Sequence, residues 1–380
     1  MNLSDALADR QRLTTARRWV VKVGSALLTN DGRGLDASVV RSLADQLVAL
    51  RDAGCEVVLV SSGAIAAGLV RLNLAERPHE VHLSQAAAAV GQSALVRAYE
   101  EHLSPHGVTS AQILLSHADI RARDRYLNAR STLSTLLGMG VLPIVNENDT
   151  VVTDEIRLGD NDTWGALVAN LVDADVLLIL TDQEGLMDRD PRQGAGAQVI
   201  ASADVHDAAL DNVAGPGGGA LGRGGMATKL SAARLAARSG TGTVIASGRV
   251  PNIINRVAAG ESLGTFLQTQ RRPQSARKQW LASLLHAQGQ LILDEGAVRG
   301  VIEQGRSLLP IGITDVSGQF ERGDLVSCVD SDGRERVRGL VNYSSGEARA
   351  LVGKASAQIE PTLGYRGEEE MIHRDNLVAG

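Results

Sequence analysis

The chain has 380 residues, of which 44% are hydrophobic and 22% are charged, the balance of an ordinary globular protein. This length allows two or three domains with a substantial buried core. The net charge of −6 and an aromatic content of 2% argue against a general nucleic-acid binder and against a protein that binds anionic membranes.

The two cysteines, Cys55 and Cys328, lie far apart and lack the paired spacing of a metal cage, which indicates a reducing compartment. No apolar run reaches the ~18 residues that a membrane helix needs. Residues 1–18 also lack the apolar segment of a secretory signal. We therefore expect a cytoplasmic protein without a membrane segment, whose residues 1–17 form a short extension.

Short apolar runs alternate with helical patterns over the first two-thirds of the chain. Most of these runs are continuously apolar, which is typical of strands buried on both faces of a sheet. Their alternation with helices predicts an α/β three-layer sandwich with a largely parallel sheet. The predicted strands are residues 19–23, 57–60, 111–115, 141–145, 176–180 and 243–246.

Helical patterns fill the intervals between these strands. Asp36 can cap a helix whose apolar residues recur every three or four positions from Val39 to Leu50, and Gly54 ends it. The other main predicted helices are residues 84–102, 125–137, 162–171 and 226–238.

The pattern changes near residue 270. Residues 270–278 are polar and basic, which indicates a linker. The short apolar stretches that follow are separated by glycine and turn residues, which predicts a small β-rich barrel. Residues from about 358 onward are charged, with few apolar positions, and predict a loosely ordered tail.

Polar clusters lie at or near the ends of the predicted strands, where parallel sheets bind ligands. Lys22 lies inside the first strand and needs an anionic partner, because desolvating its ammonium group is costly. A structural ion pair with a nearby aspartate is the alternative interpretation. The other clusters are Ser61–Gly63, Asn146–Asp149 and Thr181–Asp182, together with Gly159–Asp162 at the start of a helix.

A glycine-rich segment precedes the helix predicted at 226–238. Seven of the eleven residues 215–225 are glycine, which lets backbone N–H groups approach a ligand closely. A helix N-terminus suits a phosphate, and Lys229 adds a charge in the first turns. A flexible surface loop before an ordinary helix is the alternative. Two lysines, this glycine-rich cradle and several carboxylates together indicate phosphoryl transfer between two anionic reactants.

These residues, in this order, resemble the glutamate 5-kinases, a group within the amino acid kinase family. The matching phrases span residues 19–248 and include Val21–Ser25, Val60–Gly68, Gly91–Gln92, Leu142–Asp149, Gly159–Asp162, Thr181–Leu186 and Gly224–Lys229. The segment Leu291–Ser345 resembles a PUA domain. The resemblance implies an amino acid kinase domain at 18–269, a linker at 270–277, a PUA domain at 278–356 and a tail at 357–380.

The resemblance implies ATP-dependent phosphorylation of the side-chain carboxylate of L-glutamate to L-glutamyl 5-phosphate, the first step of proline biosynthesis. It implies catalytic roles for Lys22, Lys229 and Asp162, the last as an organiser of the two lysines. It implies glutamate contacts for Ser62, Asp149 and Asn161. Nucleotide contacts are implied for Lys22, Thr181, Asp182, Arg223, Gly224, Gly225, Met226, Ala227, Thr228 and Lys229.

The same resemblance implies Mg²⁺ on the nucleotide phosphates, with no protein side chain assigned as a metal ligand. It also implies feedback inhibition by proline and a homo-oligomer, either a dimer or a tetramer. The acyl phosphate product hydrolyses readily, so functional coupling to the reductase that consumes it is expected. The chain departs from the family at Arg223, where threonine is common, and at Trp164–Gly165, where leucine and serine are more usual.

Two alternative functions stay open at this point. The same fold could phosphorylate aspartate, carbamate or a nucleoside monophosphate, because few residues set the choice of acceptor. An RNA-binding regulator that acts through the PUA domain is the other alternative. The acidic balance and the scarcity of aromatic residues count against RNA binding.

Overall fold

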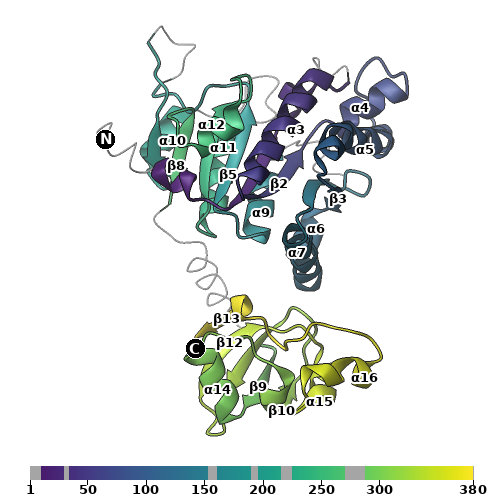
Figure 1. The fold of residues 1–380 in the computed structure, drawn as a ribbon, viewed down its shortest axis with the longest axis vertical. Helices are drawn as coiled ribbons and strands as arrows, with labels where there is room; N and C mark the ends of the chain where they lie inside the picture. The colour runs from purple at the N-terminus through teal and green to yellow at the C-terminus, as the bar shows by residue number, and fades with distance from the viewer. Residues whose placement is uncertain are drawn as a thin grey trace. The chain divides into compact units, whose positions relative to one another are not determined.

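A computed structural model of the chain describes residues 10–29, 34–152, 161–189, 196–214, 225–269 and 287–379 (Figure 1). The chain divides into two compact units. The first comprises Met1–His117 and Arg130–Pro273, and the second comprises Ala118–Ala129 and Gln274–Gly380.

The first unit is built on an eight-stranded sheet with the order β3-β4-β2-β1-β5-β7-β8-β6. Its strand pairs are parallel except for β7 and β8. All six predicted strands are present, whereas β6 and β8 are too short to stand out as apolar runs. The strands are β1 (Arg18–Val23), β2 (Glu56–Ser61), β3 (Ser110–Leu115), β4 (Leu142–Glu147), β5 (Val176–Thr181), β6 (Ser202–Asp204), β7 (Gly242–Ser247) and β8 (Thr265–Gln268).

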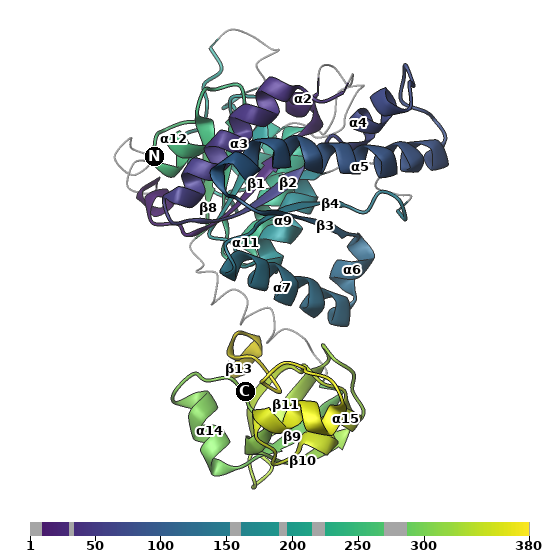
Figure 2. The ribbon, with the colours of Figure 1, turned by 45° about the vertical axis from the view of Figure 1, so that its right-hand side comes forward.

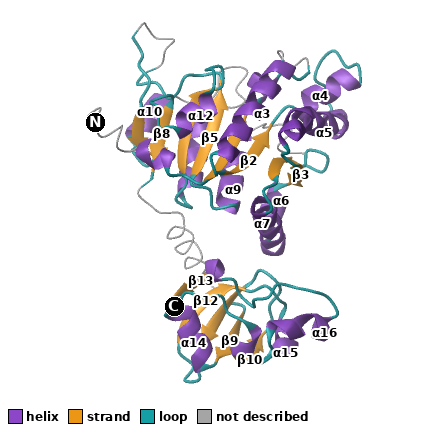
Figure 3. Cartoon of the chain, in the orientation of Figure 1, coloured by secondary structure: helices purple, strands orange, loops and turns teal. Residues whose placement is uncertain are grey.

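Helices cover both faces of this sheet, which confirms the predicted three-layer sandwich (Figure 3). Helices α3 (Ala37–Asp52), α5 (Val81–Leu103) and α12 (Ile253–Ala258) contribute to the core on one face. Helices α9 (Asn161–Leu171) and α11 (Met226–Ala237) pack on each other and on the sheet. The remaining helices of the first unit are α2 (Ser25–Leu28), α4 (Ala64–Arg71) and α10 (Ala209–Ala214). Helices α6 (His117–Arg121) and α7 (Arg123–Gly138) overlap the segment Ala118–Ala129, which belongs to the second unit.

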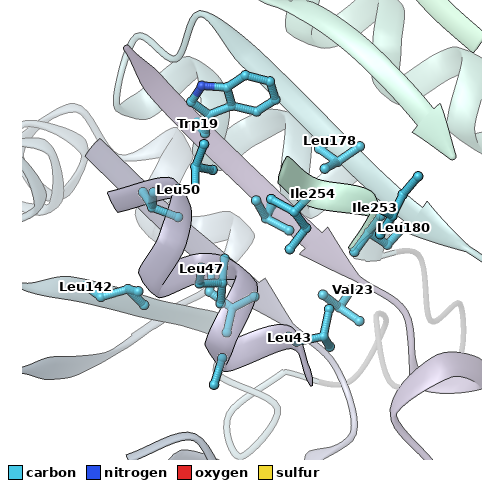
Figure 4. Packing of buried hydrophobic residues seen from close by; sticks show 14 of the residues in the cluster. Trp19, Val23, Leu43, Leu47, Leu50, Leu142, Leu178, Leu180, Ile253 and Ile254 are labelled. Atoms are coloured by element: carbon cyan, nitrogen blue, oxygen red, sulfur yellow. The ribbon is translucent and has the colours of Figure 1, made fainter. Parts of the chain in front are cut away.

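Side chains alternate along β1 between the two faces, as they must in any strand. Trp19, Val21 and Val23 belong to the core that Leu43 and Leu47 of α3 help to form (Figure 4). Lys22 is therefore directed to the opposite face, where Gly165 of α9 packs against its aliphatic stem. The register of one strand thus decides that a lysine, and not a valine, faces α9.

The start and end of α3 confirm the signals read from the sequence. The Asp36 carboxylate accepts from the backbone N–H groups of Ser38 and Val39, as an N-cap residue should. Gly54, just past the end of the helix, has a φ of +88°, which glycine adopts without strain.

The second unit holds a five-stranded sheet with the order β10-β9-β11-β12-β13, in which only β9 and β11 are parallel. Its strands are β9 (Gly289–Leu293), β10 (Ile313–Gly318), β11 (Leu325–Val329), β12 (Glu335–Leu340) and β13 (Leu377–Ala379). Helices α14 (Glu295–Ile302), α15 (Ser345–Leu351) and α16 (Ile359–Leu363) accompany them. The prediction of a small β-rich second domain is confirmed.

The described parts of the predicted extension and tail pack into the fold, which the sequence patterns did not predict. The segment after 357 is predicted as a loose tail, yet Met371 and Ile372 are fully buried and Leu377–Ala379 pairs with β12. Its few apolar residues complete the core of the second unit. In the predicted N-terminal extension, Leu13 and Arg10 are each 1% exposed. Apolar residues that are few and widely spaced show no periodic pattern in the sequence. Their burial therefore becomes visible only when the residues that pack against them are known.

Candidate active site

The predicted polar clusters meet at one edge of the large sheet, because the carboxyl ends of neighbouring parallel strands lie together. Lys22 pairs in register with Val60 of β2 and Ile179 of β5. Ser62 follows β2, and Thr181 is the last residue of β5. Figure 2 shows the central strands and the helices that accompany them from a second side.

Three predicted catalytic residues form a buried ionic cluster at this edge. The Lys22 ammonium group lies 2.6 Å from Asp162 Oδ1, and the Lys229 ammonium group lies 3.0 Å from Asp162 Oδ2. Exposed fractions are 6% for Lys22, 5% for Lys229 and 1% for Asp162. One carboxylate therefore binds the ammonium groups of two lysines, one from β1 and one from α11, and the three side chains together carry one net positive charge.

The ionisation of Asp162 follows from this environment. Burial alone would raise the pKa of its carboxyl group. The charges of Lys22 and Lys229 and their hydrogen bonds outweigh burial, so the pKa lies below its ordinary value. The carboxylate is accordingly ionised at neutral pH and keeps both lysines in place.

Two glycines leave room for the Lys22 side chain. A methyl group added at Gly165 would lie 3.2 Å from the Lys22 Cβ and Cγ atoms. One added at Gly24 would lie 3.5 Å from the Lys22 ammonium nitrogen. Trp164, the other unusual residue here, is fully buried, and its ring meets that of His117 edge-on at 5.2 Å. The departure at Trp164 thus affects packing around α9.

The predicted nucleotide contacts gather at the start of α11. Gly225 is the N-cap residue in an extended conformation, and no side chain caps the helix. Thr228 Oγ1 lies 2.7 Å from the Gly225 carbonyl oxygen and 3.3 Å from Asp162 Oδ2. Met226 and Ala227 open the helix, which brings this N-terminus next to the ionic cluster. Arg223 and Gly224 lie outside the described residues.

Two of the three predicted acceptor contacts, Asn161 and Ser62, lie next to the same cluster. The Asn161 amide nitrogen donates to Ser62 Oγ, and Asn161 immediately precedes Asp162 at the start of α9. This hydrogen bond ties the turn after β2 to the helix that carries the central carboxylate. Asp149 lies two residues beyond the end of β4, the neighbour of β2.

Thr181 and Asp182 complete the set at the end of β5. The Thr181 hydroxyl donates to the Asp182 carboxylate at 3.1 Å. Because β5 is a direct neighbour of β1, this pair lies on the same edge as Lys22. Within the described residues, neither side chain forms a hydrogen bond or ion pair with Lys22 or Lys229.

A further polar pair, Asn146 and Gln92, lies at this edge. The Asn146 amide nitrogen donates to Gln92 Oε1 at 2.9 Å, and both side chains are buried. Asn146 could be singled out from the sequence because it is a polar residue next to a run of apolar ones. Gln92 was marked only as part of the matching phrase Gly91–Gln92, since its position within an alanine-rich helix gives no other local signal.

Among the described residues, no group of three or more histidine, cysteine, aspartate and glutamate side chains could hold a metal ion. Within the same ranges, no helix combines the length and the apolar character needed to cross a membrane. The cationic cluster and the uncapped helix N-terminus instead fit the phosphates of a nucleotide.

Family models match both the large-sheet region and the C-terminal region of the chain. The amino acid kinase family model matches residues 17–247, and the PUA domain model matches residues 289–363. A UMP kinase structure from Bacillus anthracis aligns with a TM-score of 0.47 and 16% identity, covering 67% of this chain and 97% of that chain.

Relatives match over almost the whole chain. The glutamate 5-kinase of Thioalkalivibrio sulfidiphilus is 59% identical over 97% of this chain and 98% of that protein. The glutamate 5-kinase of Chromohalobacter salexigens is 59% identical over 98% of each. That of Pseudomonas entomophila is 57% identical over 97% of this chain and 99% of that protein. The chain belongs to the amino acid kinase family and, within it, to the glutamate 5-kinases.

Proposed function

We propose that the chain transfers the γ-phosphoryl group of ATP to the side-chain carboxylate of L-glutamate, which yields L-glutamyl 5-phosphate for proline biosynthesis. The observation that carries this proposal is the Asp162 carboxylate that joins Lys22 to Lys229. Two buried ammonium groups that share one carboxylate suit a reaction in which a carboxylate must approach a triphosphate, because their positive charges offset the repulsion between these anions. Family membership makes glutamate the acceptor.

The chemistry needs positioning and charge neutralisation more than proton transfer. A glutamate side chain has a pKa of ~4.3, so the attacking carboxylate is already ionised at neutral pH. One of its oxygens forms a bond to the γ-phosphorus while the bond from that phosphorus to the β,γ-bridging oxygen breaks, releasing ADP. Lys22 and Lys229 flank the phosphoryl group in transit and stabilise its charge.

On the nucleotide side, the N-terminus of α11 offers backbone N–H groups to the phosphates. We assign the nucleotide site to Lys22, Thr181, Asp182 and the stretch 223–229. Mg²⁺ bound to the phosphates supplies further charge neutralisation. Its ligands are expected to be phosphate oxygens, in keeping with the lysine-rich character of the cluster.

On the acceptor side, we assign Ser62, Asn161 and Asp149 to glutamate. The hydrogen bond from Asn161 to Ser62 brings two hydrogen-bonding side chains next to the ionic cluster. Asp149, beyond the end of β4, is suited to the ammonium group of an amino acid. This arrangement directs the side-chain carboxylate of glutamate toward Lys22 and Lys229.

Three further features belong to this proposal. Proline, the end product of the pathway, is the feedback inhibitor. The enzyme acts in the cytoplasm as a homodimer or homotetramer. It is functionally coupled to the reductase that consumes its labile acyl phosphate. Each rests on the family resemblance and stands apart from the catalytic assignment.

An ADP-release assay on the purified full-length chain with Mg²⁺ tests this function. We expect ADP release that depends on L-glutamate and that falls when proline is added. Aspartate, carbamate and a nucleoside monophosphate serve as competing acceptors. Faster turnover with one of them would overturn the choice of glutamate, and tight tRNA binding without ADP release would favour a regulator.

A further inference from the structure

Asn146 and Gln92 form a polar contact that takes no part in the lysine cluster. Asn146, the second-last residue of β4, is 2% exposed, and Gln92 of α5 is 7% exposed. The Asn146 amide nitrogen donates to Gln92 Oε1 at 2.9 Å. The pair joins β4 to α5 at the edge of the sheet where Asp149 and Ser62 also lie.

Packing alone does not account for a glutamine at position 92. Its Nε2 atom is buried and has no hydrogen-bond partner among the described residues. A buried amide nitrogen without an acceptor carries a desolvation cost that a methionine of similar length would avoid. Polar groups kept at such a cost are typical of functional sites.

A tight helix crossing fixes the place of Gln92. A methyl group added at Gly91 would lie 1.8 Å from the Ala64 carbonyl oxygen, and one at Gly68 would lie 1.8 Å from the Ala87 carbonyl oxygen. The backbones of α4 and α5 therefore touch (Figure 2). Ala64 follows Ser62 and Gly63 directly, so the crossing places Gly91, the neighbour of Gln92, against the start of the helix that follows Ser62.

The hydrogen bond to Gln92 fixes which end of the Asn146 amide is engaged. Because the Asn146 amide nitrogen donates to Gln92, the Asn146 amide oxygen is the atom that can accept a hydrogen bond from another group. No described residue donates a hydrogen bond to that oxygen. Asn146 lies at the carboxyl end of β4, and Asp149 follows that end by two residues. An amide oxygen and a carboxylate are both acceptors, and together they suit an ammonium group.

We propose that Gln92 is a positioning residue for the acceptor amino acid. It orients the Asn146 amide so that the Asn146 oxygen, together with Asp149, receives the α-ammonium group of the acceptor. This inference rests on the proposed function of the site. It adds Gln92 and Asn146 to the residues that recognise the acceptor. Because Gln92 belongs to α5, it also makes the affinity for glutamate depend on the position of this helix.

A double-mutant cycle in the full-length enzyme tests this role. The wild type is assayed first, so that a chain without glutamate-dependent activity refutes the function and not the role of Gln92. We expect Gln92→Met to raise the glutamate KM roughly tenfold. The ATP KM and kcat should stay within about twofold. Because Gln92 acts through Asn146, Gln92→Met should add nothing to Asn146→Ala.

Gln46 provides a matched control. It is also 7% exposed, but its nitrogen donates to the Ser42 carbonyl at 3.0 Å and its oxygen accepts from the Ile254 N–H at 3.0 Å. Gln46→Met should lower thermal stability without changing either KM. Additive effects in the cycle, or an equal rise in the ATP KM, would overturn the proposal.

A structure of the wild-type enzyme with glutamate decides the matter if Gln92→Met does not fold. We expect the Asn146 oxygen within hydrogen-bond distance of the amino group and the Asn146 nitrogen still on Gln92. A bound glutamate that does not touch Asn146 would refute the inference.

Discussion

Among its described residues, the first unit buries cationic side chains in two places, and the partners of each cation explain what it does. Arg10 donates to four backbone carbonyl oxygens, those of Ala201, Glu261, Leu263 and Gly264, at 2.7–3.0 Å. Its partners are neutral and belong to the fold. Lys22 and Lys229 instead share a single carboxylate. Burial of a charge therefore does not identify a functional site, whereas the chemistry of its partners does.

Burial affects the two places differently as well. It lowers the pKa of the Arg10 guanidinium to about 10, so Arg10 stays charged at neutral pH. At the other place, opposite charges overcome burial and lower the pKa of Asp162. Arg10 holds the residues around β6 and β8 to the N-terminal segment, while the lysine cluster keeps charge close to the end of β1.

The largest effect is expected at Asp162. Asp162→Asn leaves two buried ammonium groups without their carboxylate, which should lower the free energy of unfolding at pH 7 by about 3–5 kcal/mol. Because the folded pKa of Asp162 is depressed, its stabilisation is present above the unfolded value of ~3.9 and is lost as pH falls through the folded pKa.

Denaturant titrations of the wild type and Asp162→Asn between pH 7 and pH 3 measure this effect. The difference in unfolding free energy should be largest at neutral pH and should narrow below about pH 4. A difference that does not change with pH would mean that the Asp162 charge contributes nothing to stability.

The second prediction concerns the lysines themselves. Lys22→Ala or Lys229→Ala should lower kcat by roughly a hundredfold or more, because each removes one charge from the phosphoryl group in transit. The protein should stay folded, since Asp162 keeps the other lysine as partner. Steady-state kinetics on protein with a native circular dichroism spectrum measures this, and a near-normal kcat would remove that lysine from the mechanism.

The third and smallest effect is expected at Arg10, which serves as the matched control for the lysines. Arg10→Met should cost about 2 kcal/mol of unfolding free energy, because four carbonyl oxygens lose a charged donor. The kcat of the remaining folded enzyme should be unchanged. If Arg10→Met lowered kcat strongly without lowering the free energy of unfolding, Arg10 would contribute to catalysis and not only to the fold.

Much of this molecule could be predicted from local patterns. The buried strands, the Asp36 cap and the helix start at Met226 are read from residues close together in sequence. The polar ends of parallel strands indicate the functional edge for the same reason. Patterns fail at Leu377–Ala379 and at Arg10, whose partners lie far along the chain.

By itself, the sequence determined the sandwich, the parallel sheet and the edge where the polar strand ends gather, because hydrophobic periodicity and strand direction are local properties. The family resemblance implied that Asp162 organises Lys22 and Lys229, but only the tertiary structure decided the geometry of these two ion pairs and the hydrogen bond between Asn146 and Gln92. Ion pairs and hydrogen bonds depend on atoms a few ångströms apart, and folding brings those atoms together from distant parts of the chain.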